Sequence, residues 1–447
     1  MYSSVLNYPR VARIYLHLKH GMNPRLFLIF LGIPGIICQT NEANFTGHKL
    51  IGAFPSSEKE IDVLRELRNN SDVDLWNAPS ALYEKVNLLL TPEIADEVEE
   101  KLKDNGIDFY VVTNNIQKWI DQEKATNTPD LFEQIQDVSR FDLQKYHRLD
   151  EINVYLDEFA KLNGHMASVI TIGHSAQNNP IKGLKIGNPG NHNKPVIWID
   201  AGIHSREWVA PATALFLIDH LWKKSSDSRV KKLLDTFDWY IIPVLNPDGY
   251  VHTWSGNRMW RKNRIVSGSR FFQTCYGVDP NRNFDADFGK AGTDSNPCSD
   301  IYPGSAAFSE NESRAVRDAI MPMRNRVKAY FTVHAYSQLW MIPYGYKRET
   351  TKDFLAQMTA LQKAANAIVQ KHGQWYRYGA IANTIYPASG SSTDWAYEKA
   401  GIKYSFALEL RDKGQYGFLL PNSLIKPTAE ETIEGIFAVA EHVIAEL

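Results

Sequence analysis

The stretch Val196-Ile-Trp-Ile-Asp-Ala-Gly-Ile-His204-Ser-Arg-Glu207 carries a His-x-x-Glu motif at a change of pattern in the sequence. An apolar, strand-like run from Val196 to Ala201 precedes the motif, and an apolar, helix-like run from Trp208 to Trp222 follows it. One imidazole nitrogen and one carboxylate oxygen are two of the three protein ligands that a catalytic zinc ion needs. Such a string also occurs by chance, and a histidine near a strand end is often a structural residue. A third ligand, a general base and a substrate-binding group are therefore needed before the motif indicates an enzyme.

Strand-like and helix-like patterns alternate from Phe141 to the end of the chain. Continuous apolar strands separated by amphipathic helices are typical of a sheet that is covered on both faces. We therefore predict an α/β fold with a mixed, mostly parallel, twisted sheet and helices on both faces, in which ligands gather at the carboxyl ends of strands. The predicted strands are Val169 to Ile172, Ile181 to Ile186, Val196 to Ala201, Trp239 to Leu245, Ala329 to Val333 and Tyr404 to Leu410, and the later helices are Thr351 to Lys371 and Thr428 to Glu446.

Three further polar residues lie where such a sheet would present them. His334 directly follows a predicted strand and is a candidate third ligand, although a packed structural histidine is an equal alternative. Glu409 lies near the end of another strand, where a carboxylate is costly unless it has a function or a partner. It is either a general base toward water at the metal or one half of a structural ion pair with Arg411. Asp279, in Gly-Val-Asp-Pro-Asn-Arg-Asn-Phe, is a candidate to orient a ligand imidazole from the outer shell.

Residues 45–120 have the pattern of a separate, small α+β domain. A polar segment, residues 121–140, connects this domain to the larger one, residues 141–447. The segment contains Lys124 and Arg140, and a solvated stretch with basic residues is where a trypsin-like protease can cut. An ordinary linker that is never cleaved is the alternative.

Residues 1–40 differ from the rest of the chain. Basic residues precede the apolar run Leu26 to Cys38, which is too short to span a bilayer as a stable helix. We therefore predict a secretory signal, with Met22 as an alternative start, and a secreted, extracellular protein. A membrane anchor is the alternative, and Gly32, Pro34 and Gly35 within the run argue against it.

Composition excludes some classes of partner. The chain has 447 residues, 44% of them hydrophobic, and a net charge of -2, so it can bury a large core and lacks the basic footprint of a nucleic-acid-binding protein. Of its three cysteines, Cys38 would leave with the signal, and Cys275 and Cys298 remain as a pair for which we expect a disulfide. The sequence does not fix the oligomeric state, and we expect a monomer without a membrane partner.

Six motifs follow one another in the larger domain. They are Gly202-Ile-His-Ser-Arg-Glu-Trp, Asn257-Arg-Met-Trp-Arg-Lys, Asp279-Pro-Asn-Arg-Asn-Phe, His334-Ala-Tyr-Ser-Gln, Tyr386-Pro-Ala-Ser-Gly and Phe406-Ala-Leu-Glu-Leu-Arg-Asp. Because several long motifs occur in the same order, the chain from about Tyr146 resembles the zinc carboxypeptidases of the carboxypeptidase A/B family. The segment before it resembles the activation domain of that family.

The resemblance implies one zinc ion per chain, held by His204, Glu207 and His334. It implies that Glu409 is the base that activates water and passes the proton to the departing amine. It also implies that Arg261 polarises the scissile carbonyl and stabilises the oxyanion, for which a fixed positive charge is suited.

The resemblance also assigns the residues that bind the substrate. Asn281 and Arg282 would grip the terminal carboxylate, to which a guanidinium offers two parallel hydrogen bonds, and this grip makes the enzyme exo-acting. Tyr386 would close over the substrate, and the loop between Cys275 and Cys298 matches the disulfide of the family. Arg206, Ala335 and Tyr336 would line the adjoining subsites.

Specificity depends on the pocket for the C-terminal side chain. Thr393 occupies the position of an Asp in the basic-specific branch of the family, with Gly345, Ile381 and Ala388 nearby. A Lys or Arg side chain would therefore enter without a charged partner, so we predict a preference for apolar or aromatic C-terminal residues.

Two functions from other classes remain as alternatives. A catalytically silent binding homologue of the same fold would lack a ligand, the base or the clamp, and all of these residue types are present here. A serine hydrolase would need a Gly-x-Ser-x-Gly elbow, which the sequence does not contain. The leading prediction is a zymogen of a zinc carboxypeptidase that acts on peptide and protein C-termini after cleavage by a trypsin-like protease.

Overall fold

The computed structural model describes residues 42–68, 70–129, 137–190, 193–270 and 273–447, which lie in one compact unit. The predicted signal, with Met22 and Cys38, lies outside these residues. So does most of the middle of the predicted connecting segment. None of the described helices is both long enough and apolar enough to cross a membrane.

The amino-terminal domain is an α+β unit, as the sequence pattern predicts. Its antiparallel sheet has the order β2-β3-β1-β4, and the hydrophobic residues of α1 and α2 pack with those of the strands. Ser57 caps α1 by accepting the Glu60 N–H, as expected from the Ser-x-x-Glu pattern. The elements are β1 (Lys49–Phe54), α1 (Glu58–Leu67), β2 (Val73–Leu75), β3 (Val86–Leu90), α2 (Ala95–Asp104), β4 (Asp108–Thr113) and α3 (Gln117–Thr126).

Helix α3 corrects the expected solvated linker. The polar segment was predicted from residue 121, but the helix continues through it to Thr126. Glu123 is buried and forms an ion pair with the buried Arg258, Oε2 to Nε at 2.5 Å. Polar composition indicated solvent exposure, whereas a charged partner 135 residues away allows the carboxylate to be buried.

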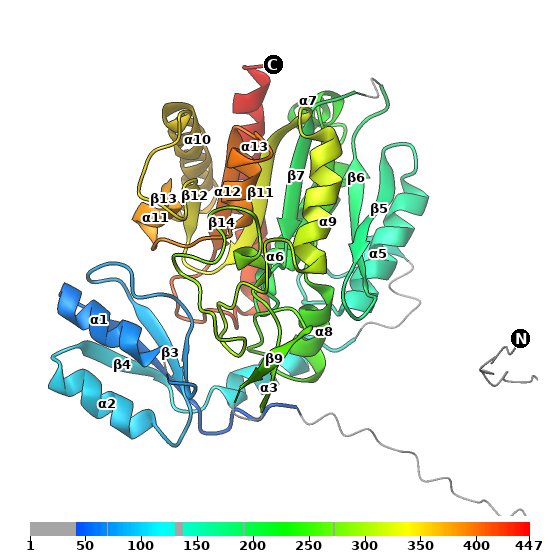
Figure 1. Cartoon of the computed structure of the whole chain (residues 1–447). Coiled ribbons are helices and arrows are strands. Elements are labelled where there is room, and N and C mark those ends of the chain that lie inside the picture. Colours follow the sequence, from blue (N-terminus) through cyan, green and yellow to red (C-terminus); the bar gives the residue numbers. More distant parts are fainter. Residues whose placement is uncertain (1–41, 69, 130–136, 191–192, 271–272) are drawn as a thin grey trace, which may run out of the picture. The chain divides into compact units, whose positions relative to one another are not determined.

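An eight-stranded mixed sheet forms the centre of the larger domain, in the order β13-β12-β14-β11-β7-β8-β6-β5 (Figure 1). The pairs β13–β12, β14–β11, β11–β7 and β7–β8 are parallel, and the other three are antiparallel. The strands are β5 (Ala167–His174), β6 (Pro180–Ile186), β7 (Val196–Ala201), β8 (Asp238–Ile242), β11 (Val327–Ala335), β12 (Leu339–Ile342), β13 (Arg377–Ala380) and β14 (Tyr404–Leu410).

Helices cover both faces of this sheet, as predicted. Alternate residues of β7 enter different clusters: Ile197 and Ile199 pack with α6, α10 and α13, whereas Val196 and Trp198 pack with α9 and α12. The helices are α5 (Leu149–Leu162), α6 (Val209–Lys223), α7 (Ser228–Thr236), α8 (Pro247–Ser255), α9 (Asn311–Ile320), α10 (Phe354–His372), α11 (Ile381–Thr384), α12 (Ser392–Glu398) and α13 (Ile425–Ile444).

Short elements complete the larger domain. A hairpin of β9 (Val266–Arg270) and β10 (Gln273–Tyr276) lies outside the main sheet, and the single-turn helices are η1 (Val138–Arg140), η2 (Pro280–Arg282), η3 (Met321–Met323) and η4 (Asn422–Leu424). Cys275 of β10 forms a disulfide with Cys298, which confirms the predicted pair.

The parallel strands β7, β11 and β14 bring three chain segments to one edge. In the register, His334 of β11 is directly opposite Glu409 of β14, and Val333 is opposite Ala201, the last residue of β7. The loop that carries His204 begins at the same edge. Because parallel strands end together, these segments meet at the carboxyl edge of the sheet.

Candidate active site

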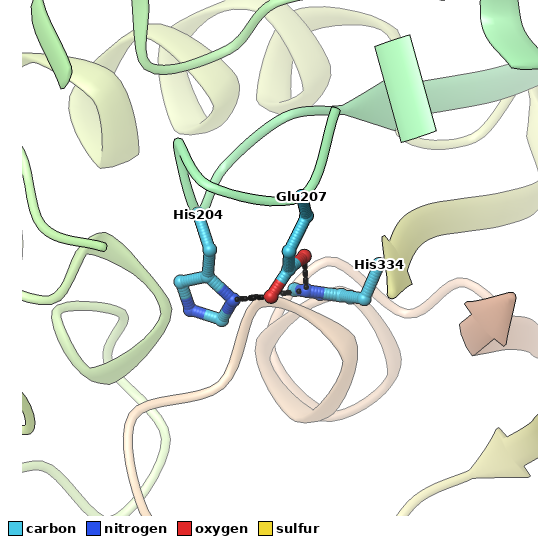
Figure 2. Close-up of side chains that lie close together, drawn as sticks. All are labelled: His204, Glu207 and His334. Carbon is cyan, nitrogen blue, oxygen red and sulfur yellow. Dashed lines mark hydrogen bonds and ion pairs between the residues drawn. The ribbon is translucent and has the colours of Figure 1, made fainter. Parts of the chain in front are cut away.

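His204, Glu207 and His334 form a buried cluster (Figure 2). His204 and Glu207 lie in the loop between β7 and α6, and their Nδ1 and Oε1 atoms are 2.9 Å apart. The second carboxylate oxygen of Glu207 is 3.2 Å from His334 Nδ1, and one ligand atom from each residue lies within 4.8 Å of the others. Two imidazole nitrogens and a carboxylate in this arrangement fit a catalytic zinc site, which keeps its remaining position for water.

The charges in and around the cluster of His204, Glu207 and His334 favour the binding of a cation. Burial lowers the pKa of His204, and the nearby positive charge of Arg261 lowers it further, so the ring is neutral and can bind a metal. Burial acts to raise the pKa of Glu207, but His204 and His334 outweigh this effect and the pKa lies well below its usual value. The site therefore offers a neutral His204 imidazole and the negative charge of Glu207.

Asp279 holds several of these groups together. Its Oδ1 lies 3.1 Å from His204 Nε2 and accepts the Asn281 N–H at 2.9 Å, and its Oδ2 accepts the Arg261 Nη2–H at 2.8 Å. Burial alone would raise the pKa of Asp279, but Arg261 and then His204 hold it well below its usual range. A carboxylate on the distal nitrogen of a ligand histidine fixes the tautomer and the ring orientation.

Glu409 lines the same cavity as the cluster of His204, Glu207 and His334, and it forms no ion pair with another described residue. Arg411 instead pairs with Glu431 of α13, with Arg411 Nε and a Glu431 carboxylate oxygen 2.7 Å apart, so the Glu409–Arg411 pair considered from the sequence is wrong. Burial raises the pKa of Glu409 well above its ordinary value, and the negative charge of Glu207 raises it further. A carboxyl group with a raised pKa beside a metal site has the properties of a general acid–base group.

A group of donors lies on the other side of the cluster. Arg282 donates from Nε to Gly292 O at 3.0 Å and from Nη2 to the Tyr386 hydroxyl at 3.0 Å. The Asn281 side-chain oxygen accepts the Ser392 N–H at 2.9 Å, so its amide nitrogen faces the site. These contacts hold a guanidinium and an amide where an anionic group can reach both.

One cavity of about 1030 Å³ joins these groups. Of the residues predicted for the site, Gly345, Asp279 and Cys275 do not line the cavity. The predicted residues that do line it are His204, Arg206, Glu207, Arg261, Asn281, Arg282, Cys298, His334, Ala335, Tyr336, Ile381, Tyr386, Ala388, Thr393 and Glu409. Ala335 has a further contact, because its N–H donates to Glu207 Oε2 at 3.2 Å.

Gly345 lies directly behind the wall of the cavity. A Cβ at this position would come within 3.3 Å of both Ile381 Cγ2 and Ala388 O, so a larger residue would push the wall inward. Asp394, which the sequence analysis did not single out, accepts the Gly345 N–H at 2.8 Å and the Tyr346 N–H at 3.2 Å. The sequence signal for Asp394 was its position next to Thr393. Both residues lie in α12, in which the residues from Ser392 to Tyr397 are buried.

The side-chain pocket has an apolar wall that the sequence did not reveal. Leu339 and Met341 of β12, Ile381 of α11 and Ala407 of β14 form a separate cluster that lines the cavity. Met341 faces Ala407 through the antiparallel pairing of β12 and β14. Short apolar segments give no signal of which strand they pair with, so this pocket depends on register.

The amino-terminal domain contacts two of the predicted substrate-binding residues. Asp74 Oδ2 lies 2.9 Å from Arg206 Nη1, and the Arg206 guanidinium lies 4.3 Å from the ring centre of Phe418. Trp76 packs edge-on against Tyr336, with ring centres 6.4 Å apart. The amino-terminal domain therefore lies next to the cluster of His204, Glu207 and His334.

Comparison with known proteins matches both parts of the chain. Residues 152–435 match the family model described as zinc carboxypeptidase, and residues 52–123 match that of the carboxypeptidase activation peptide. The chain is 42% identical to carboxypeptidase A2 of Mus musculus over 94% of this chain and 99% of the relative. It is 37% identical to carboxypeptidase B of Bos taurus over the same shares.

The chain belongs to the zinc carboxypeptidase family. Solved structures agree. The structure of thrombin activatable fibrinolysis inhibitor has a TM-score of 0.82 and 33% identity, covering 90% of this chain and 100% of that one. Carboxypeptidase A from Helicoverpa armigera has a TM-score of 0.80 and 30% identity, covering 90% of this chain and 98% of that one. This zinc carboxypeptidase therefore has the predicted fold, an activation domain before it, and a His-Glu-His cluster that fits the zinc site of the family.

Proposed function

We propose that this zymogen is secreted and that its mature form removes single apolar or aromatic residues from the C-termini of peptides and proteins. The observation that carries the proposal is one cavity in which the cluster of His204, Glu207 and His334, a carboxyl group with a raised pKa and the Arg282 guanidinium meet. A zinc-dependent carboxypeptidase needs all three, because it must recognise the chain end and hydrolyse the bond next to it.

We assign the chemical steps as follows. His204, Glu207 and His334 would hold the zinc ion, which would supply Lewis-acid chemistry toward the scissile carbonyl and the attacking water. Glu409 takes a proton from the attacking water and passes it to the leaving amine. Arg261, held by Asp279 through a 2.8 Å hydrogen bond, stabilises the negative charge that develops on the carbonyl oxygen.

Substrate binding at the chain end is assigned to three residues. Arg282 and Asn281 bind the terminal carboxylate, and Tyr386 covers it. The Tyr386 hydroxyl already lies 3.0 Å from Arg282 Nη2, which supports a role in the same subsite. Recognition by a charged, planar donor selects a free carboxylate over an internal peptide bond.

The side-chain preference follows from the pocket wall. Leu339, Met341 and Ile381 present apolar surface, and Thr393 lines the same cavity with a hydroxyl. Placing a Lys or Arg side chain there would bury a charge without a partner, whereas an aromatic side chain gains from desolvation. Thr393 lines the cavity, so its hydroxyl can pair with a polar group on a substrate ring.

The activation domain keeps the enzyme silent in this proposal. Asp74 engages Arg206, and Trp76 covers Tyr336, so neither residue can meet a long substrate. Removal of the domain would open the subsites beyond the scissile bond.

We propose that activation cleavage follows Arg140. Its side chain is 73% exposed and belongs to a single turn, whereas Lys124 lies in α3 and pairs with Glu42. A protease binds its substrate in an extended form, and an exposed single turn unfolds more readily than a helix of ten residues, which favours Arg140 over Lys124. We also propose that the secreted enzyme is a monomer.

One experiment tests the function. Purified precursor is treated with trypsin, and the release of Phe from a blocked peptide is measured before and after exhaustive chelation and zinc return. The proposal expects activity only after cleavage, loss on chelation and recovery with zinc. No activity after complete cleavage and zinc loading would instead indicate the silent binding homologue.

A further inference from the structure

The imidazoles of His204 and His334 have different partners at Nε2, the ring nitrogen that does not face Glu207. His204 Nε2 faces a carboxylate, Asp279 Oδ1, at 3.1 Å. His334 Nε2 faces the Thr332 hydroxyl at 3.3 Å and the Asn281 amide nitrogen at 3.4 Å. No carboxylate oxygen of a described residue lies within hydrogen-bond distance of His334 Nε2. The third ligand therefore lacks a direct carboxylate partner of the kind that His204 has.

The position of the protons identifies the partner of His334. Its Nδ1 faces Glu207 and His204 Nδ1, so Nδ1 is the ligand atom and Nε2 carries the hydrogen. Asn281 cannot accept that hydrogen, because its oxygen already accepts the Ser392 N–H and its NH₂ group faces the ring. Thr332 Oγ1 is then the acceptor.

A hydroxyl that accepts from a histidine still has its own hydrogen to donate. Thr332 of β11 is directly opposite Asp200 of β7 in the parallel register, so the two side chains are neighbours on the same face of the sheet. Asp200 is fully buried; its Oδ2 accepts the Trp198 indole N–H at 2.8 Å, and its Oδ1 has no hydrogen-bond partner among the described residues, so it is available as an acceptor for the Thr332 hydroxyl. Burial raises the pKa of Asp200, and the Thr332 hydroxyl acts against this rise, as expected of a donor beside the carboxylate.

We propose that Asp200 and Thr332 form a relay, carboxylate to hydroxyl to imidazole, that positions His334 for zinc. Asp200 orients the hydroxyl, and the hydroxyl oxygen fixes the Nε2–H and hence the ring. Each ligand histidine then depends on a buried carboxylate, which is direct for His204 and acts through one hydroxyl for His334. Partners in the outer shell of a zinc site typically change metal affinity by about 10- to 100-fold when they are removed.

The relay is tested by zinc affinity in the full-length precursor. The dissociation constant is measured by competition with a chromogenic chelator for wild type, Thr332→Ser and Thr332→Val, together with the melting temperature of each metal-free protein. We expect Thr332→Val to bind zinc about 10- to 100-fold more weakly and Thr332→Ser to stay near wild type. Asp200→Asn, which keeps the shape but loses the charge, is expected to weaken binding in the same direction.

Thr213→Val is the matched control. Thr213 is a buried threonine of α6 whose hydroxyl has no partner, so removing that hydroxyl leaves zinc affinity unchanged. Thr332→Ala provides a second variant without a hydroxyl if Thr332→Val does not fold. Equal zinc affinity in Thr332→Ser and the variants without a hydroxyl overturns the relay. So does a loss of affinity that Thr213→Val reproduces. These readouts do not depend on peptidase activity, so they separate the relay from the proposed function.

Discussion

Asp74 Oδ2 lies 2.9 Å from Nη1 of Arg206, a residue two positions after the zinc-cluster residue His204. The Arg206 side chain is 3% exposed and also donates to Met259 O at 3.2 Å. An activation-domain carboxylate thus neutralises a buried arginine that we assign to substrate binding. We therefore propose that inhibition in the precursor is both steric and electrostatic.

We expect Asp74→Asn to raise the activity of the uncleaved precursor about tenfold. Loss of a charge-assisted hydrogen bond weakens the closed arrangement by roughly 1.5 kcal/mol, and each 1.4 kcal/mol corresponds to a factor of ten. Hydrolysis of a peptide of five or more residues is measured with a trypsin inhibitor present. Asp62→Asn, in an exposed pair of the same domain, is the control. Equal precursor activity in both variants would show that Asp74 does not contribute.

Glu123→Gln is expected to destabilise the precursor by about 3–5 kcal/mol, because it leaves the buried Arg258 without its negative partner. The free energy of unfolding is measured by urea titration. Lys124→Gln on the same helix removes a partly exposed pair and is expected to cost less than about 1 kcal/mol. A similar loss in the two variants would contradict the proposed importance of burial.

Arg282→Gln is expected to lower kcat/KM for a free-acid peptide roughly 100-fold, because two charge-assisted hydrogen bonds to the terminal carboxylate are lost. The preference of the enzyme for a free acid over the C-terminal amide should fall with it. Both peptides are assayed after activation, with Arg317→Gln on α9 as the control. An unchanged ratio of acid to amide cleavage would refute the assigned clamp.

Thr393→Val is expected to lower the ratio of kcat/KM for C-terminal Tyr to that for Phe about fivefold. A net hydrogen bond between the Thr393 and Tyr hydroxyls contributes roughly 1 kcal/mol, and valine removes it without changing the volume much. Matched peptides ending in Tyr, Phe, Leu, Lys and Glu measure the preference. A wild-type enzyme that strongly prefers Lys would disprove the assigned specificity.

We expect the free energy of unfolding to decrease as the pH rises from about 4 to about 7, because of the raised pKa of Asp394. Burial raises the pKa of Asp394 from 3.8 to about 7, despite hydrogen bonds from Gly345 and Tyr346. The folded protein therefore holds a proton that the unfolded chain releases, which gives a slope of about -1.4 kcal/mol per pH unit in this window and none above it.

Asp394→Asn should remove this contribution. Urea unfolding at pH 5, 6, 7 and 8 is compared between wild type and variant, since Glu312, with a pKa that burial also raises to about 7, contributes a similar slope to both. Parallel stability curves would mean that Asp394 does not titrate in this range.

The sequence predicted the features that depend on local pattern. The sheet with helices on both faces is confirmed, and a cluster of His204, Glu207 and His334 fits the zinc site of the family. Each of these ligands lies at or just after a strand end, where patterning is informative. The roles of Glu409 and Arg282 remain predictions.

Other features depend on contacts that local pattern does not encode. The face-to-face position of Met341 and Ala407 follows from the antiparallel pairing of β12 with β14. The Asp74–Arg206 pair joins residues 132 positions apart. Burial of Glu123 depends on Arg258, so its polar surroundings in the sequence were misleading. Asp200 did have a signal, since it is a carboxylate within an apolar strand, but its relation to Thr332 needs the register.

The pairing of His334 with Glu409 across β11 and β14 has a consequence for how such an enzyme can diversify. The spacing between a metal ligand and the proposed base is set by backbone hydrogen bonds of the sheet, whereas Thr393 and Ile381 belong to short helices outside the sheet. Substitutions in those helices can change which C-terminal residue is preferred without moving the metal ligand or the proposed base. Grafting residues 381–395 from a relative of different preference should therefore transfer selectivity as a single module.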